Sequence, residues 1–316
     1  MLTMDGVLII DKPAGMTSHD VVARARKISG ERRIGHTGTL DPFATGVLVL
    51  LIGRATRIAQ FLSGAEKEYE AKVRLGYSTN TGDVTGQRVE PPNDATSQRL
   101  QSLNKEQIES AIACLRGEIQ QLPPMYSAKK IAGRKLYEHA RRGEEVAREP
   151  RRVMIHEFDL VTPLESLSPN NDGSIDIQVR IACSAGTYIR TLAEDLGKEL
   201  AVGGAHLTEL RRTRAGQFGI DAALTLEALA DAFIQNHLIE ALISPHQALS
   251  YLPAIDLDDE QLRRTLHGVE LPVSEKDRQL SHGDSIRLSR NNELIAVGKF
   301  DSERMVIHPS VVLTIA

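Results

Sequence analysis

One aspartate lies in the most irregular part of the sequence, where a carboxylate could act as a catalyst. Asp41 stands between Leu40 and Pro42, in a segment that also contains Gly35 and Gly38. A residue that precedes proline is driven out of helical geometry, so this carboxylate projects from a rigid, irregular backbone. Aspartate also favours turns, because its side chain hydrogen-bonds to the nearby backbone. For an isolated Asp-Pro pair the turn is the more common explanation, so the surrounding residues must decide.

Several kinds of chemistry have recognisable motifs, and four of the best known are absent from the sequence. It has no GxxxxGKS or GxxxxGKT phosphate loop, no GxGxxG after a predicted strand, no HExxH and no GxSxG. The ten histidines never recur at metal-binding spacing on one predicted helix. We therefore expect any reaction here to need neither a cofactor nor a metal.

The composition is typical of a folded protein without a membrane span. The 316 residues are 41% hydrophobic and 25% charged, and a chain of this length forms about two domains. The longest apolar run, at residues 46–52, is far shorter than a transmembrane helix. The N-terminus lacks the basic start of a signal peptide, and the distant pair Cys114 and Cys183 excludes a disulfide scaffold and a cysteine zinc cluster. We expect a cytoplasmic protein.

Charge is distributed unevenly along the chain. The net charge is −4, yet residues 221–260 contain eight acidic residues and no lysine or arginine, so the remainder carries +4. Basic residues are concentrated at 24–57 and 117–152. Such zones can bind phosphate groups, or they can be solvated helix faces, and the charges alone leave both interpretations open.

The elements on either side of Asp41 must position it. We expect a strand at residues 6–10, followed by a helix with Ser18 as its N-cap. The glycines of residues 34–46 predict one long loop without regular structure, and a buried strand follows at 47–52.

Further along, hydrophobic periodicity predicts an alternation of strands and helices. We expect strands at Lys67–Leu75, Ile175–Cys183 and about 205–215, and helices at 105–115, around 135–142, after Thr187 as N-cap, and twice within 224–243. Beyond a boundary near 249–253, short alternating runs predict a small all-β module.

Five segments together resemble the TruB-type tRNA pseudouridine synthases, which convert uridine 55 in the T-loop of tRNA. They follow one another in the order of that family, between Gly6 and about Gly216. The segments are DKPAGMTSHDVV, GHTGTLDPFATGVL, KEYEAKVRLG, PPMYSAKKIAGRKLYEHARRG, and CSAGTYIRTLAEDLG with the following GGAHLTELRRT. The tail resembles a PUA domain, a small RNA-binding β-barrel. Residues 90–103 and 164–171 look like additions to the family pattern.

The resemblance implies a pseudouridine synthase fold, which is mixed α/β with a central, largely antiparallel sheet flanked by helices. We expect the catalytic domain at residues 1–249, with an RNA-contacting basic loop at about 122–150. A PUA-like RNA-binding β-barrel domain is expected at residues 250–316.

The same resemblance implies three catalytic residues. Asp41, in the LDP motif, would be the catalytic carboxylate, and Arg190 would pair with it and hold it ionised. Tyr69, in KEYEA, would stack on a target base that has left its neighbours in the RNA. Without the resemblance, Tyr69 would be a core tyrosine and Arg190 an exposed arginine on a helix.

Further residues would bind the substrate. Tyr188 and Leu210 match residues that line the uracil pocket, and His36 matches the histidine that fills the space vacated in the T-loop. Lys12 would support the active-site loop. Phosphate contacts, which position RNA without reading its sequence, would come from Lys129, Lys130, Arg134, Arg141 and Arg142.

The implied function is isomerisation of uridine in tRNA, with the T-stem-loop as partner and no cofactor, no membrane and no obligate protein partner. We expect a monomer. Two alternatives stay open: an RNA-binding or RNA-chaperone protein with little turnover, and a guide-RNA-dependent relative that modifies ribosomal RNA. The set of Asp41, Tyr69 and Arg190 favours an enzyme, because a binding protein has no need for all three.

Overall fold

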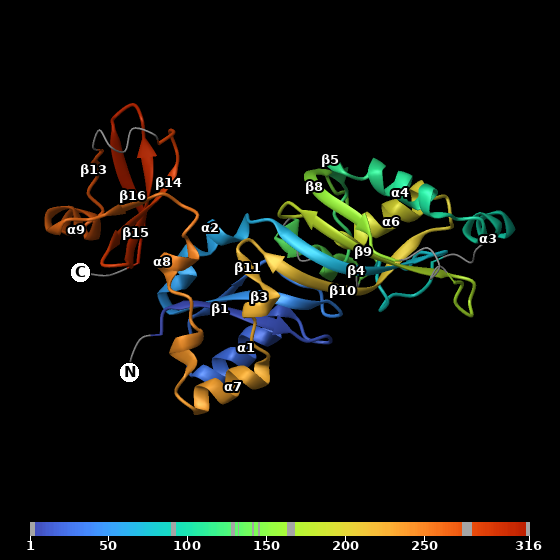
Figure 1. Cartoon of the computed structure of the whole chain (residues 1–316), viewed down its shortest axis with the longest axis horizontal. Helices are drawn as coiled ribbons and strands as arrows, with labels where there is room; N and C mark the ends of the chain where they lie inside the picture. The colour runs from blue at the N-terminus through green and yellow to red at the C-terminus, as the bar shows by residue number, and fades with distance from the viewer. Residues whose placement is uncertain are drawn as a thin grey trace.

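A large mixed sheet forms the body of the protein, and a separate curled sheet lies at one end (Figure 1). The structure, a computed structural model, describes residues 4–89, 93–127, 130–131, 133–140, 142–144, 146–162, 168–273 and 280–313. The strands of the large sheet are β1 (Gly6–Lys12), β2 (Ile34–Thr37), β3 (Thr45–Ile52), β4 (Lys67–Leu75), β5 (Gly117–Gln121), β8 (Arg151–Leu160), β9 (Ile175–Cys183), β10 (Ala205–Ala215) and β11 (Phe218–Gly219).

Its main strand order is β1-β3-β10-β4-β9-β8-β5, with β2 beside β3 and β11 beside β10. The pairing of β3 with β10 is parallel, and the other pairings of this sheet are antiparallel. The predicted mixed α/β class with a largely antiparallel central sheet is therefore confirmed.

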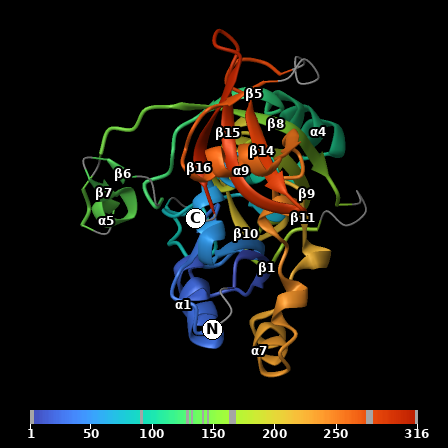
Figure 2. The ribbon, with the colours of Figure 1, turned by 90° about the vertical axis from the view of Figure 1, so that its left-hand side faces the viewer.

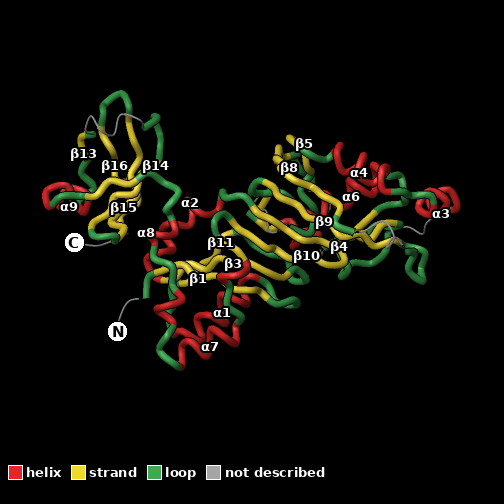
Figure 3. Tube along the Cα trace, viewed as in Figure 1, coloured by secondary structure: helices red, strands yellow, loops and turns green. Residues whose placement is uncertain are grey.

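Most helices lie along the large sheet and around its ends, and α9 lies beside the C-terminal sheet (Figure 3). They are α1 (Ser18–Ser29), α2 (Ala59–Ser63), α3 (Asp94–Gln101), α4 (Lys105–Cys114), α5 (Leu136–Ala140), α6 (Ile189–Glu199), α7 (Leu226–Ile234), α8 (Pro245–Ala248) and α9 (Asp259–Leu266), with 3-10 turns η1 (Gly53–Ile58), η3 (Ile220–Ala222) and η4 (Leu238–Ala241). The core between α4, α6 and strands β4, β8, β9 and β10 is one cluster of buried apolar side chains.

Strands β1 and β3 each contain an unbroken apolar run, at residues 7–10 and 47–52, and both faces of these runs are buried. On one face, Leu8 and Leu50 pack in a cluster with side chains of α1 and α7. On the other face, Val7 and Ile9 pack in a second cluster, which includes Leu249. A strand buried on both sides shows no polar alternation, which explains the continuous apolar runs in the sequence.

The C-terminal sheet contains β12 (Ala254–Asp256), β13 (Leu271–Pro272), β14 (Ser285–Arg290), β15 (Glu293–Asp301) and β16 (Val306–Val312), in the order β12-β14-β15-β16-β13. Phe300 and Ile307 contribute to a core of its own. Leu294, Val297 and Leu313 instead belong to the cluster that contains Val7 and Ile9 of β1. The domain boundary between residues 249 and 250 stays a prediction.

A small arm projects to one side of the sheets (Figure 2). It contains β6 (Lys130–Ile131), β7 (Arg134–Lys135) and α5, and β6 pairs with β7. The arm falls within the predicted basic loop at residues 122–150.

Two predicted helix caps are wrong. Thr17, not Ser18, caps α1: its side chain accepts from the N–H of Asp20, and the Asp20 carboxylate accepts from the N–H of Thr17. Helix α6 begins after Tyr188, and Thr187 donates its hydroxyl to the Ser184 carbonyl at 2.9 Å. In each case the capping position lies one residue from the predicted one.

The prediction of an unbroken loop at residues 34–46 is also wrong at both ends. Residues Ile34–Thr37 form β2, which pairs with β3, and β3 itself begins at Thr45. Glycine does not exclude a strand where a neighbouring strand supplies hydrogen bonds, as β3 does for Gly35. Of the apparent additions, residues 90–92 and 164–167 lie outside the described residues, and α3 occupies most of the first.

Candidate active site

Asp41 lies in the short loop that remains between β2 and β3. Its carboxylate is largely surrounded by protein, and 34% of its side chain stays exposed. Burial raises the pKa of Asp41, and the neighbouring Arg190 opposes this effect. The site therefore desolvates a carboxylate and supplies a positive charge that favours its ionised form.

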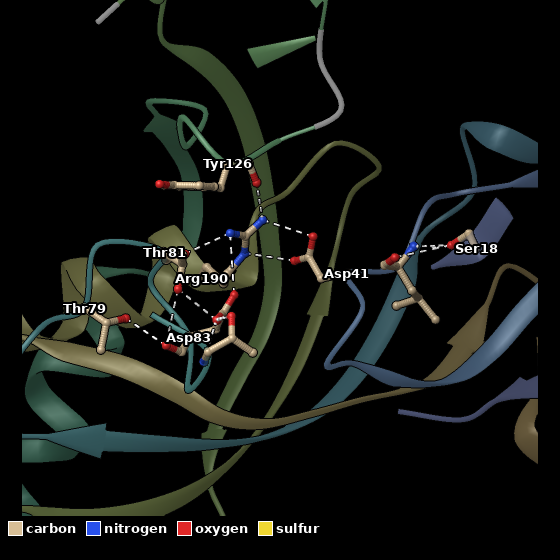
Figure 4. Close-up of polar contacts among 9 residues, drawn as sticks. Ser18, Asp41, Thr79, Thr81, Asp83, Tyr126 and Arg190 are labelled. Carbon is tan, nitrogen blue, oxygen red and sulfur yellow. Dashed lines mark hydrogen bonds and ion pairs between the residues drawn. The ribbon is translucent and has the colours of Figure 1, made fainter. Parts of the chain in front are cut away.

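Arg190 holds the Asp41 carboxylate through two parallel contacts (Figure 4). Its Nε lies 2.8 Å from Asp41 Oδ2, and its Nη2 lies 3.0 Å from Oδ1. The same guanidinium donates to the carbonyls of Thr81 at 2.8 Å and Tyr126 at 2.7 Å. Only 5% of the arginine side chain is exposed, so it is not the exposed helix arginine of the alternative interpretation. A planar guanidinium with four contacts has one orientation, and it fixes the carboxylate in turn.

A second carboxylate completes the network. Asp83, which is 4% exposed, lies with Oδ2 3.7 Å from Arg190 Nη1. Thr81 and Thr85 donate their hydroxyls to Asp83 Oδ1, and Thr79 donates to its carbonyl. No motif in the sequence singled out this residue, which lies in the stretch NTGDVTG. The available signal was an acid flanked by two threonines, whose hydroxyls can satisfy a buried carboxylate.

Lys12 supports the loop that contains Asp41. This lysine is fully buried, and its Nζ donates to the carbonyls of Pro13, Met16 and Pro42 at 2.8, 2.7 and 3.2 Å. Burial lowers the pKa of Lys12 to about 8. Because Pro42 directly follows Asp41, this contact joins β1 to the loop that contains Asp41.

Tyr69 and Leu210 lie in the same buried cluster as Leu40, which precedes Asp41. Tyr69 faces Arg212 across the pairing of β4 with β10, and burial raises its pKa. Arg212 is 1% exposed and donates to the carbonyls of Val47 and Gly38 at 2.6 and 2.9 Å. The structure thus brings Tyr69 and Leu210 to the core beside the aspartate loop.

Gly46 is needed where β3 passes β10. It has φ of 98°, and a Cβ at this position would lie 2.1 Å from the Arg212 carbonyl oxygen. No other residue type permits the two strands to approach this closely, so the strand pairing requires glycine at this position of the ATGVL run.

Tyr188 stands at the start of α6, two residues before Arg190. Its N–H donates to Gln121 Oε1 at 2.9 Å, and Gln121 Nε2 donates to its carbonyl at 3.3 Å. Its side chain is half-buried. These bonds fix the backbone from which both Tyr188 and Arg190 project.

His36 lies apart from the arginine network, on β2. Its ring makes an edge contact with the exposed His19 of α1, with centroids 5.2 Å apart. Its Nδ1 is buried without a hydrogen-bond partner among the described residues, and burial lowers its pKa. A neutral, half-buried ring is suited to contact a nucleobase.

The predicted phosphate contacts are only partly described. Lys129 and Arg141 lie outside the described residues. Lys130 begins β6, Arg134 is exposed in β7, and Arg142 is exposed just after α5. All three belong to the projecting arm (Figure 2).

Among the described residues, no group of three or more histidine, cysteine, aspartate or glutamate side chains is arranged to hold a metal ion. None of the helices described is long and apolar enough to cross a membrane.

Comparison with known proteins gives consistent matches. Residues 26–189 match the family model of the TruB family pseudouridylate synthase N-terminal domain, and residues 190–274 match the tRNA pseudouridylate synthase B C-terminal domain. The chain is 45% identical to a tRNA pseudouridine synthase B of Thermobifida fusca, over 85% of this chain and 87% of that protein. It is 42% identical to the Bacillus cytotoxicus protein of the same name, over 95% and 94% of the two chains.

Solved structures also resemble the chain over nearly its whole length. A Cbf5-Nop10-Gar1 complex contains a chain 28% identical, with a TM-score of 0.72 and coverage of 98% of this chain and 85% of that one. An H/ACA RNP bound to a substrate RNA containing 2'-deoxyuridine gives 26% identity and a TM-score of 0.70, with the same coverage. With both family models and relatives above 40% identity in agreement, the chain belongs to the TruB family of pseudouridylate synthases, enzymes that isomerise uridine in RNA.

Proposed function

We propose that the chain converts uridine 55 in the T-loop of tRNA to pseudouridine, with Asp41 as the catalytic carboxylate. The observation that carries the proposal is the two-point contact of Arg190 with Asp41, at 2.8 and 3.0 Å in a largely desolvated loop. The tRNA substrate is supported by relatives that bear the name tRNA pseudouridine synthase B.

The isomerisation exchanges one bond to the ribose for another. The bond from uracil N1 to C1′ breaks, the base turns, C5 bonds to C1′, the C5 proton is lost and N1 gains a proton. Loss of the first bond develops positive charge on the sugar, which a nearby carboxylate stabilises or traps, as in glycosidases. Asp41 supplies this carboxylate, and Arg190 keeps it ionised despite its burial.

The target base would enter between Tyr69, Tyr188 and Leu210 after leaving the RNA stack. An aromatic face and an apolar wall suit an unstacked uracil. His36, with its ring beside His19 at the surface, would occupy the space that the base vacates. We assign residues 1–249 to catalysis and residues 250–316 to a PUA-like RNA-binding domain.

The projecting arm would contact the T-stem-loop. Arg134 and Arg142 are exposed on it, and Lys130 lies at its start, so the arm carries positive charge away from the sheet. Phosphate contacts of this kind position the RNA over the site. We expect one monomer to act on one tRNA without a protein partner.

The test is release of tritium from a tRNA transcript labelled at uridine C5, with purified protein and EDTA. We expect about one equivalent from the wild type, mapped to the T-loop, and none from Asp41→Asn. The matched control is Asp176→Asn, because Asp176 is held by Arg74 through two similar contacts at 2.7 and 2.8 Å on the surface of the sheet.

Substantial turnover by Asp41→Asn would refute the catalytic assignment. Tight tRNA binding without any release would instead favour the RNA-chaperone alternative. Tritium release that requires an added guide RNA would favour the alternative of a guide-RNA-dependent enzyme.

A further inference from the structure

We propose that Ser18, in the first turn of α1, is a positioning residue that sets the place of Asp41. The proposal rests on the proposed function, in which Asp41 is the catalytic carboxylate. Ser18 has no contact with Asp41 itself, and it would act through the backbone of the preceding residue.

The N–H and the carbonyl of Leu40 both form a hydrogen bond with the Ser18 hydroxyl (Figure 4). The Leu40 N–H donates to Ser18 Oγ at 2.9 Å, and Ser18 Oγ donates to the Leu40 carbonyl at 3.3 Å. Ser18 is fully buried and Leu40 is 3% exposed, so water does not compete for these bonds. The backbone immediately before Asp41 is therefore tied to a rigid helix.

The residue after Asp41 is fixed by the same sequence segment. The Pro42 carbonyl accepts from the Gly15 N–H at 2.8 Å and from Lys12 Nζ at 3.2 Å. Asp41 is thus held on both sides by residues 12–18, the stretch KPAGMTS. Gly38 lies close by at φ of 71°, a left-handed conformation that residues other than glycine rarely adopt.

The shifted helix cap makes this role available to Ser18. Thr17 and Asp20 satisfy the exposed end of α1 between them, so the Ser18 hydroxyl is not needed there. A hydroxyl is the smallest side-chain group that can donate and accept at once, as the two Leu40 bonds require. Alanine at this position would leave the buried Leu40 N–H without its hydrogen-bond partner. Threonine would add a methyl group at a fully buried position.

The chain offers a matched control on the same helix. Ser29 is the other buried serine of α1, and its hydroxyl also makes two bonds, to the Ala25 carbonyl at 2.8 Å and from the Glu31 N–H at 3.3 Å. It has no contact with the catalytic loop. Ser29→Ala therefore removes an equivalent hydroxyl without moving Asp41.

The experiment compares Ser18→Ala, Ser18→Cys, Ser29→Ala and Asp41→Asn with the wild type. Single-turnover tritium release at saturating enzyme gives the rate, filter binding gives the Kd for tRNA, and thermal unfolding reports folding. We expect Ser18→Ala to lower the rate about 10- to 100-fold, the effect of a displacement near 1 Å, with Kd unchanged. Ser18→Cys, whose thiol is a weaker donor and acceptor, should fall between serine and alanine.

A rate for Ser18→Ala equal to that of Ser29→Ala would overturn the proposal, as would a loss confined to Kd. If Ser18→Ala does not fold, the rate of Ser18→Cys decides: wild-type turnover overturns the proposal, and reduced turnover at unchanged Kd supports it. Asp41→Asn separates the two hypotheses. If that variant is active, the proposed catalytic role fails, whereas an inactive Asp41→Asn beside a fully active Ser18→Ala refutes only the positioning role.

Discussion

Arg190→Lys tests whether the fork geometry of the guanidinium matters or only its charge. Lysine keeps the positive charge but presents it at one point, so it cannot reproduce both contacts with the Asp41 carboxylate. At least one charge-assisted hydrogen bond to Asp41 is lost. The variant therefore isolates orientation from electrostatics as far as one substitution can.

The size of the effect follows from the exposure of the partner. A hydrogen bond to a charged group contributes about 1.5–3 kcal/mol. Because 34% of the Asp41 side chain is exposed, solvent screening places this bond in the lower part of that range, about 1.5–2 kcal/mol. A loss of this size from the active arrangement corresponds to a rate about 10- to 30-fold lower.

The pH dependence of the deficit has a definite sign. Burial raises the pKa of Asp41 and Arg190 lowers it, so a weaker contact lets the pKa rise. The reactive carboxylate form then becomes scarcer as the pH falls. The rate deficit of Arg190→Lys should grow toward acidic pH and shrink toward alkaline pH.

Single-turnover tritium release across a pH series measures both quantities. The control is Arg74→Lys, which breaks the comparable two-point pair with Asp176 on the sheet surface and should leave the rate unchanged. A wild-type rate for Arg190→Lys at every pH would refute the reasoning. A deficit of the same size at every pH would show that the lysine disturbs geometry without affecting ionisation.

Two further perturbations have expected outcomes. The Asp83 carboxylate raises the pKa of Asp41, so Asp83→Asn should extend activity toward lower pH, opposite in direction to Arg190→Lys. A pH-rate series checks this, and a shift toward higher pH would contradict it. On the arm, the double variant Arg134→Gln with Arg142→Gln should weaken tRNA binding and reduce the slope of log K against log salt by about 1.4–1.8, since each lost phosphate contact contributes about 0.7–0.9. Kd measured at several salt concentrations tests it, and an unchanged slope would exclude these side chains from phosphate binding.

The sequence was sufficient for features that depend on local pattern. Strands β1, β3, β4, β9 and β10 were predicted because apolar runs and alternation report burial directly. The local pattern made Asp41 only a candidate, because aspartate before proline is also typical of a turn, and its expected catalytic role came from the family resemblance. The pairing of Asp41 with Arg190 came from the family resemblance, since the two residues lie far apart in the chain and no local pattern connects them.

The features that were missed depend on tertiary contacts. Ser18 was expected to cap α1, but choosing between adjacent Thr17 and Ser18 requires knowing that Leu40 offers the serine a buried partner. Strand β2 was missed because it is formed by pairing with β3, and its own residues carry no strand pattern. Asp83 was missed because a turn and a buried acid have the same sequence signature until Arg190 is placed beside it.

The cluster shared by the two sheets affects how the chain can fold while it is being synthesised. Val7 and Ile9 of β1 leave the ribosome first, yet Leu294, Val297 and Leu313, which belong to the same cluster, are made only near the end. Domains generally fold as units during synthesis, N-terminal ones first. Here the cluster that contains the first strand is completed only by residues some 300 positions later. A nascent or shortened chain therefore presents an unfinished apolar face, which molecular chaperones and proteases recognise.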